Sequence, residues 1–146
     1  MTASAAHHGG YISDYFPKVE QIDSEIPGNA REYLRQAIES IHAPAAAVLL
    51  AASAIDSMLK EKGYKEGHLK PRIDQAQKDN VITLEMAKWA HQVRLDANDP
   101  RHADEAKPLP NEEDARLSIE FAKALGTFMF TLPARVTRGI KDSEPK

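Results

Sequence analysis

Ionisable and amide side chains gather in residues 94–102, at the point where an apolar helical pattern stops. If this chain does chemistry, Arg94, Asn98, Arg101 and His102 are its strongest candidates. A histidine whose pKa is about 6.5 can accept or donate a proton at neutral pH. An arginine beside it can stabilise negative charge that develops on a reacting group. The segment therefore predicts a site where a proton moves beside an anionic group.

The same residues also fit a purely structural role. Arg94 can pair with Asp96, with Asp99 or with an acid on a neighbouring helix. Asn98 can cap a helix end from a left-handed conformation. His102 can hydrogen-bond a buried carbonyl and so fasten the loop that follows. The residue types alone leave both interpretations open.

We expect no metal site and no cofactor. His91, His102 and Asp104 contain no pair at the i, i+4 spacing that presents two ligands from one helix. His7 and His8 lack acidic neighbours that would help them hold a metal ion. The chain has no Gly-rich phosphate loop, no G-x-S-x-G turn and no H-E-x-x-H motif.

Composition predicts one globular domain. The chain has 146 residues, 42% apolar and 28% charged, with a formal net charge of −3. This charge gives no general attraction to nucleic acid or to a membrane surface. Cysteine is absent, which favours a reducing compartment, and we expect a cytoplasmic protein. The first ten residues lack the basic start and apolar core of a signal peptide, and no run is apolar enough to span a membrane.

Apolar residues recur at helical spacing in five stretches, at about 29–42, 44–63, 71–78, 83–97 and 111–132. Asn29 and Asn111 are the expected N-caps of the first and last helices. Pro133 is expected to end the last helix. Three further prolines predict a loop over 98–110 that continues neither neighbouring helix.

Short connections between these helices predict an all-α, up-and-down bundle of about five helices. We expect residues 1–26 to form a partly mobile arm, 27–140 the helical domain and 141–146 a tail. Residues 45–54 are apolar nearly all round, so their helix is either central in the bundle or shared with another subunit. Asp56 is expected to be exposed or paired with a neighbouring helix, and Trp89 to anchor a core or an interface.

A basic run is the best candidate for contact with phosphate groups, although a solvated surface is the ordinary interpretation of such a run. Its members are Lys60, Lys62, Lys65, Lys70 and Arg72.

Three runs of the chain carry a family resemblance: APAAAVLLAASAIDSMLKEKG, LKPRIDQAQKDNVITLEMAKWAHQVRLDANDPRHADE and NEEDARLSIEFAKALGTFMFTLP. Together they resemble a bacterial domain of unknown function in the HEPN superfamily, which is found alone and appended to restriction enzymes. The resemblance covers about residues 27–140. Its most specific element is the spacing of Arg94, Asn98 and His102, followed by an acid-capped helix.

The resemblance implies an all-helical, HEPN-like bundle that pairs into a homodimer, with the two motif segments near the subunit interface. It also implies a setting in bacterial defence and an RNA or protein partner. Active HEPN members cleave RNA without a metal, using an arginine, a polar residue and then a histidine. When Asn98 and His102 are laid on that pattern, the arginine position falls on Ala97.

Arg94, one turn earlier, and Arg101, beside the histidine, are the cations that could replace the missing arginine. Nearby acids would repel a phosphodiester: Asp96, Asp99, Asp104 and Glu105. The sequence therefore favours a noncatalytic, dimeric interaction or regulatory module. The alternative is a metal-independent ribonuclease in which His102 acts with Arg94 or Arg101.

Overall fold

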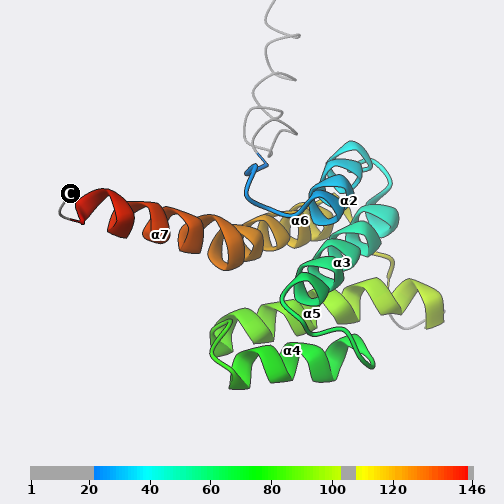
Figure 1. The fold of residues 1–146 in the computed structure, drawn as a ribbon. Helices are drawn as coiled ribbons and strands as arrows, with labels where there is room; N and C mark the ends of the chain where they lie inside the picture. Colours follow the sequence, from blue (N-terminus) through cyan, green and yellow to red (C-terminus); the bar gives the residue numbers. More distant parts are fainter. Residues whose placement is uncertain (1–21, 103–107, 145–146) are drawn as a thin grey trace, which may run out of the picture.

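The structure, a computed structural model, describes residues 22–102 and 108–144, except for the side chains of residues 99–102. Every regular element in this part of the chain is helical, which confirms the all-α prediction (Figure 1). The elements are α2 (Gly28–Glu39), α3 (Pro44–Glu61), α4 (Leu69–Lys78), α5 (Leu84–His102), α6 (Glu112–Gly126), the π-helical turn η2 (Thr127–Thr131) and α7 (Leu132–Ser143).

Helix α3 is the centre of the bundle. It contacts α2, α4, α5 and α6, and its small side chains let these neighbours approach closely. Its buried residues are Ala47, Val48, Ala51, Ala52, Ala54, Ile55, Met58 and Leu59. The apolar stretch 45–54 is therefore explained by burial within one chain. Pro44 lies in the first turn of α3, and Gly63, with a φ of 99°, follows its last residues as expected.

Helix α2 begins earlier than expected. Pro27, not Asn29, is its N-cap residue, with φ −55° and ψ 150°. The Pro27 carbonyl accepts a hydrogen bond of 2.9 Å from the Arg31 N–H. Because the proline ring fixes φ near this value, Pro27 suits the extended geometry that an N-cap needs. Asn29 consequently lies inside the first turn of α2.

The expected break after Ala97 is wrong, because α5 continues through Pro100 to His102. A proline removes one hydrogen bond from the helical ladder, which costs most in the middle of a helix. Pro100 is followed by only two more helical residues, so the one backbone hydrogen bond that it removes lies at the end of α5 and not in its middle. The candidate residues 94–102 therefore belong to one helix and not to a helix and a loop.

The expected end at Pro133 is also wrong. Helix α6 passes into η2, where the Leu132 N–H donates to the Thr127 carbonyl across five residues. This wider turn changes the hydrogen-bond register, so that Pro133 lies in the first turn of a renewed helix, α7. At that position the missing N–H of proline costs little.

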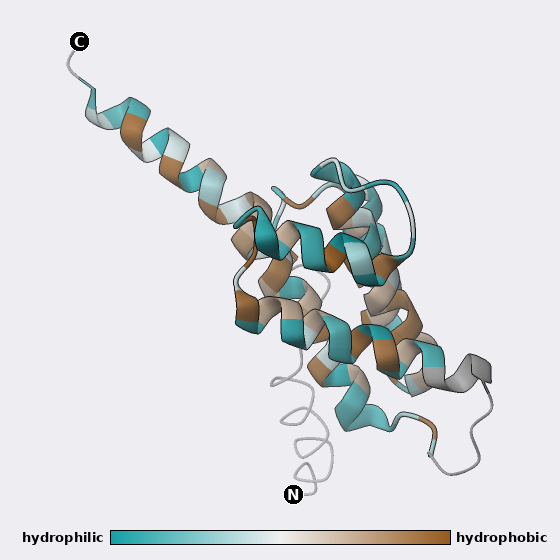
Figure 2. Cartoon of the chain, turned by 90° about the horizontal axis from the view of Figure 1, so that it is seen from below, coloured by the Kyte–Doolittle hydropathy of each residue, from teal (hydrophilic) through white to brown (hydrophobic). Residues whose placement is uncertain are grey.

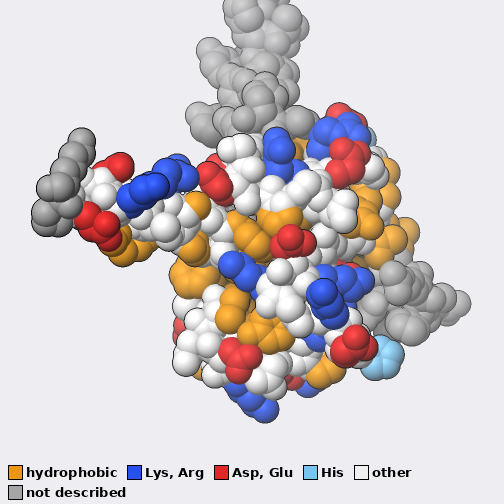
Figure 3. All heavy atoms as spheres, in the orientation of Figure 1, with side chains coloured by type: hydrophobic (Ala, Val, Ile, Leu, Met, Phe, Trp, Pro, Cys, Tyr) orange, Lys and Arg blue, Asp and Glu red, His pale blue; other side chains and the backbone are white. Residues whose placement is uncertain are grey.

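Helix α7 projects from the bundle (Figure 1). Among the described helices it contacts only η2, the turn from which it continues. Hydrophobic residues recur along α7 beyond the body of the protein (Figure 2). In Figure 3 they form one edge of the helix, and lysine and arginine side chains form the other.

Trp89 is less buried than a core residue. Its ring lies against Phe121 of α6, with centroids 4.6 Å apart, yet 43% of Trp89 remains exposed. No helix in the described ranges combines the length and apolar character needed to cross a bilayer.

Candidate functional site

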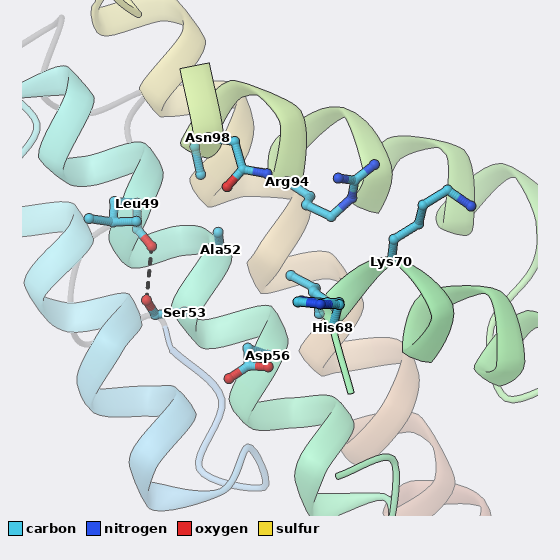
Figure 4. A pocket seen from close by; sticks show the side chains of 10 residues that line it. Leu49, Ala52, Ser53, Asp56, His68, Lys70, Arg94 and Asn98 are labelled. Atoms are coloured by element: carbon cyan, nitrogen blue, oxygen red, sulfur yellow. Dashed lines mark hydrogen bonds between the residues drawn. The ribbon is translucent and has the colours of Figure 1, made fainter. Parts of the chain in front are cut away.

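A pocket of about 380 Å³ opens between α3, the start of α4 and α5 (Figure 4). Polar and apolar side chains from these three helices share its wall. They are Leu49, Ala52, Ser53, Asp56, His68, Leu69, Lys70, Arg94, Ala97 and Asn98. Two of the residues singled out in the sequence, Arg94 and Asn98, therefore line the same pocket.

Arg94 is the least satisfied side chain of this pocket. It is partly buried, and its Nε atom is enclosed without a hydrogen-bond partner. No hydrogen bond or ion pair joins Arg94 to another residue in the described part of the chain. Leaving a buried donor unpaired costs about 1–3 kcal/mol, and more for a charged group.

The start of α4 contributes His68, Leu69 and Lys70 to the pocket wall. His68 is the N-cap residue, and Lys70 lies in the first turn. Lys70 Nζ lies 3.1 Å from Asp74 Oδ2, and His91 Nε2 lies 2.8 Å from Asp74 Oδ1. The hydrogen bond with His91, and then that with Lys70, lower the pKa of Asp74 below its usual value. Asp74 thus connects α4 to α5 and holds the Lys70 ammonium one turn further along α4.

Asp56 is the carboxylate of the pocket, and it is already neutralised. Arg72 donates a hydrogen bond to Asp56, and Lys60 Nζ lies 3.0 Å from it. Burial alone would raise the pKa of Asp56, but these two donors outweigh it and lower the pKa. The expectation that Asp56 pairs with a neighbouring helix is confirmed, since Arg72 belongs to α4.

Arg72 was expected to contribute to a solvated basic run, but it is 8% exposed. Besides Asp56, it donates to the carbonyls of Gly67, at 3.3 Å, and Tyr64, at 3.2 Å. It therefore fastens the α3–α4 connection. The basic run is thus divided between a structural arginine and surface lysines.

The remaining sequence candidates have different outcomes. Ala97, at the arginine position of the nuclease pattern, is 5% exposed and forms part of the pocket wall. Asn98 lies inside α5, so its proposed left-handed cap is wrong, and the only described non-glycine residue with positive φ is Asn80. The side chains of Arg101 and His102 lie outside the described part of the chain, so the proposed catalytic set stays a prediction.

Sequence reasoning missed His68 as a pocket residue and did not join Lys70 to Arg94. His68 precedes α4 and Lys70 lies in its first turn, and α4 packs against α5. Both residues are far from Arg94 along the chain, so the helical periodicity of the sequence does not connect them with it. The one available indication was the basic run itself, which placed Lys70 among candidates for phosphate contact.

Comparisons with known proteins place the chain in a family. A model of the family described as Domain of unknown function (DUF4145) matches residues 34–143. No curated protein and no solved structure matches the chain. The matched region contains α3 to α7 and hence the whole pocket wall. The chain therefore belongs to the DUF4145 family.

Proposed function

We propose that this protein is a noncatalytic, HEPN-like interaction module that acts as a homodimer through α7. The observation that carries the proposal is the exposure of α7: none of its residues is buried. The setting in bacterial defence, suggested by the resemblance to HEPN domains, forms part of the same proposal.

The exposed side chains of α7 form a stripe. Leu132, Val136 and Ile140 follow one another at intervals of four residues, which places them on one side of the helix. They are 42%, 60% and 57% exposed, respectively. In water such a stripe contributes nothing to folding, because helices in proteins gain most of their stability by packing an apolar face. A surface of this kind is typical of a helix that another chain covers.

A second copy of this chain is the partner that we propose. HEPN-like domains often pair, and two-fold dimers are the commonest assemblies, because one patch serves both copies. Helix α7 also extends away from the body, so two such helices can approach without the bundles meeting (Figures 1 and 2).

The length of α7 limits the strength of this dimer. Twelve residues make a helix about 18 Å long, at roughly 1.5 Å per residue. An interface built on it is smaller than the roughly 800 Å² per partner of stable complexes. We therefore expect a reversible dimer whose population rises with protein concentration.

The noncatalytic part of the proposal is supported by Ala97. A methyl group occupies the position at which the nuclease pattern has a guanidinium, and it is closed into the pocket wall.

Size-exclusion chromatography with light scattering tests the homodimer. The wild-type mass should rise towards that of two chains with concentration, and the double variant Val136→Ser/Ile140→Ser should remain a monomer. The matched control, Thr137→Ser/Lys141→Ser, changes two exposed positions on another side of α7 and should dimerise as wild type. A wild-type monomer at every concentration, or equal dimerisation of both variants, would contradict the proposal.

A metal-independent ribonuclease is the second candidate. The observation in its favour is that Arg94 and Asn98 line one pocket and share α5 with His102. Incubation with mixed RNAs in EDTA, beside His102→Ala, separates the two functions. Cleavage that disappears in His102→Ala would establish the enzyme, and the absence of His102-dependent cleavage would remove it.

A further inference from the structure

We infer that the two α7 helices of the homodimer lie antiparallel, with Arg135 of each chain beside Asp142 of the other. The homodimer itself is the function proposed above, and this arrangement rests on it. Three features of the described residues carry the arrangement: the direction of the apolar stripe, two unpaired charges and an exposed glycine.

The apolar stripe of Leu132, Val136 and Ile140 is turned to the side on which the bundle extends (Figure 3). Arg138 lies roughly 200° around the helix from Val136, at 3.6 residues per turn. It binds Glu25 at 3.0 Å, and this contact holds the opposite side of α7 against the chain's own residues. A helix that covers the stripe therefore lies beside the bundle, with its axis about 8–10 Å from that of α7.

This position of the covering helix determines its direction. Helix α7 continues back through η2 into α6 of its own bundle. In a parallel pair, α6 of the second copy would enter the space that the first bundle fills. In an antiparallel pair, the second bundle lies beyond the projecting end of α7, and the two bundles stay apart (Figures 1 and 3).

Two charges of opposite sign, Arg135 and Asp142, lie along one border of the stripe. At 3.6 residues per turn, they project within about 20° of each other. Both are exposed, and no hydrogen bond or ion pair joins either one to another residue in the described part of the chain. Asp142 also lies in the last turn of α7, where the negative end of the helix dipole disfavours an acid. Both charges therefore lack a stabilising partner among the described residues.

Antiparallel packing supplies a partner for each charge. A two-fold axis perpendicular to the helices brings the same border of each helix together. Arg135 then faces Asp142 of the second copy, and the reverse pair forms by symmetry. The axis passes midway between the two charges, and Val136 comes to within one residue, roughly 1.5 Å along the helix, of Ile140 of the second copy. One register therefore satisfies both the charges and the stripe.

Parallel packing would instead bring opposite borders of the stripe together. The border away from Asp142 carries Glu144, the C-cap residue of α7. Asp142 would then lie near Glu144 of the second copy, and two like charges at this distance repel each other. The charges thus favour the same direction as the position of the bundles.

Gly139 lies where the two antiparallel helices would be closest, beside the two-fold axis. It is inside α7, where glycine is less favourable than alanine. Outside α7, no atom of the described chain lies within 4 Å of the position that its Cβ would occupy. The missing side chain therefore has no use within the described chain, whereas it allows a second backbone to approach closely.

Disulfide trapping tests the direction of the helices, because the chain contains no cysteine of its own. The variants Val136→Cys and Ile140→Cys are mixed in equal amounts, at a concentration at which the wild type dimerises, and oxidised with glutathione disulfide. Facing positions of the antiparallel pair lie close enough for a disulfide, so the product that joins one chain of each variant should predominate. Intact mass spectrometry distinguishes this product from dimers of one variant. Lys141→Cys, on the far side of α7, measures the background from random collisions.

The results separate this arrangement from the homodimer on which it rests. A wild-type chain that stays monomeric, with disulfides no faster than those of Lys141→Cys, would overturn the homodimer and the arrangement together. A dimer in which each variant forms a disulfide mainly with itself would mean parallel helices, and would overturn the arrangement alone.

Charge reversal tests the contact between Arg135 and Asp142. Arg135→Glu and Asp142→Arg should each raise the dissociation constant of the dimer about fivefold or more, because each loses two ion pairs and places like charges together. The combined variant Arg135→Glu/Asp142→Arg exchanges the two charges and should dimerise close to wild type. Sedimentation equilibrium measures all three dissociation constants.

Lys141→Glu is the matched control for Arg135→Glu. It makes the same change in net charge on the far side of α7, and it should dimerise as wild type. Equal weakening by Lys141→Glu and Arg135→Glu would mean that net charge alone controls association. That result, or a combined variant weaker than either single variant, would overturn the proposed contact.

Discussion

Two arginines on adjacent helices have opposite environments. Arg72 is buried and fully paired, whereas Arg94 has an enclosed Nε without a partner. The sequence singled out Arg94, because it lies in the polar segment 94–102, where the apolar helical pattern stops. It placed Arg72 in a solvated run, because Asp56 lies sixteen residues away and no local spacing joins the two. The sequence left Asp56 exposed or paired with a neighbouring helix, and it did not identify Arg72 as the partner.

The pairing of Asp56 with Arg72 should make stability depend on pH. Asp56→Asn should lower the free energy of unfolding at neutral pH by about 1–3 kcal/mol, because Arg72 loses a charged partner. The folded pKa of Asp56 lies below its ordinary value of 3.8. Its contribution is therefore complete above pH 3.8 and is lost as the pH falls through the lower, folded pKa.

Urea unfolding at a series of pH values measures this effect. The difference between wild type and Asp56→Asn should be constant from neutral pH to just above 3.8 and should decrease below it. Asp142→Asn, at an exposed position of α7, is the control and should show no such change. A difference that grows on acidification would contradict the pairing.

At the scale of elements, the two predicted N-caps had different outcomes, because Asn111 caps α6 whereas Asn29 lies inside the first turn of α2. Asn111 was predicted as an N-cap, and it forms a complete capping box with Asp114. The rule that a proline ends a helix failed at Pro100 and Pro133. Such a rule considers only the missing N–H, whereas the cost of a proline is smaller near the end of a helix, as at Pro100, or in a first turn, as at Pro133. The π turn before Pro133 leaves no local signal that sequence periodicity can detect.

The capping box supports a prediction on α6. The Asn111 side chain accepts from the Asp114 N–H at 2.8 Å, and Asp114 accepts in return at 3.0 Å. Asn111→Ala should lower the free energy of unfolding by about 1 kcal/mol. Asn111→Asp retains the acceptor and should be close to wild type in thermal and urea unfolding. An unchanged free energy of unfolding in Asn111→Ala, or an equal loss in Asn111→Asp, would contradict this prediction.

The contact between η2 and Asp23, which precedes α2, supports a further prediction on stability. Asp23 accepts hydrogen bonds from Thr127 Oγ1, at 2.8 Å, and Thr131 Oγ1, at 3.0 Å. Thr131 is 3% exposed, so Asp23→Ala would leave a buried hydroxyl without its acceptor. The free energy of unfolding should fall by about 1–3 kcal/mol in urea unfolding.

Glu25→Ala is the matched comparison for Asp23→Ala. It removes the exposed ion pair with Arg138, at 3.0 Å, and surface pairs contribute about 0–1 kcal/mol. We therefore expect a clearly smaller loss than in Asp23→Ala. The reverse order would mean that the ion pair, and not the threonine contacts, stabilises this junction.

For the whole molecule, composition and periodicity predicted an all-α protein, and the described residues confirm it. Composition and periodicity did not predict that α7 projects from the bundle. The stripe of Leu132, Val136 and Ile140 has the spacing of any core-facing helix, and periodicity does not show which surface covers a stripe. The apolar stretch 45–54 left two possibilities, a central helix or one shared with another subunit, and its helix α3 is central in the bundle.

Amide hydrogen exchange of α7 at low and high protein concentration tests the central claim most directly, because it reports on the proposed interface itself. If a second copy covers the stripe, exchange in α7 should slow as the concentration rises, while exchange in α3 stays constant. Val136→Ser/Ile140→Ser should abolish this dependence. Fast exchange in α7 at every concentration, beside an intact bundle, would contradict the account.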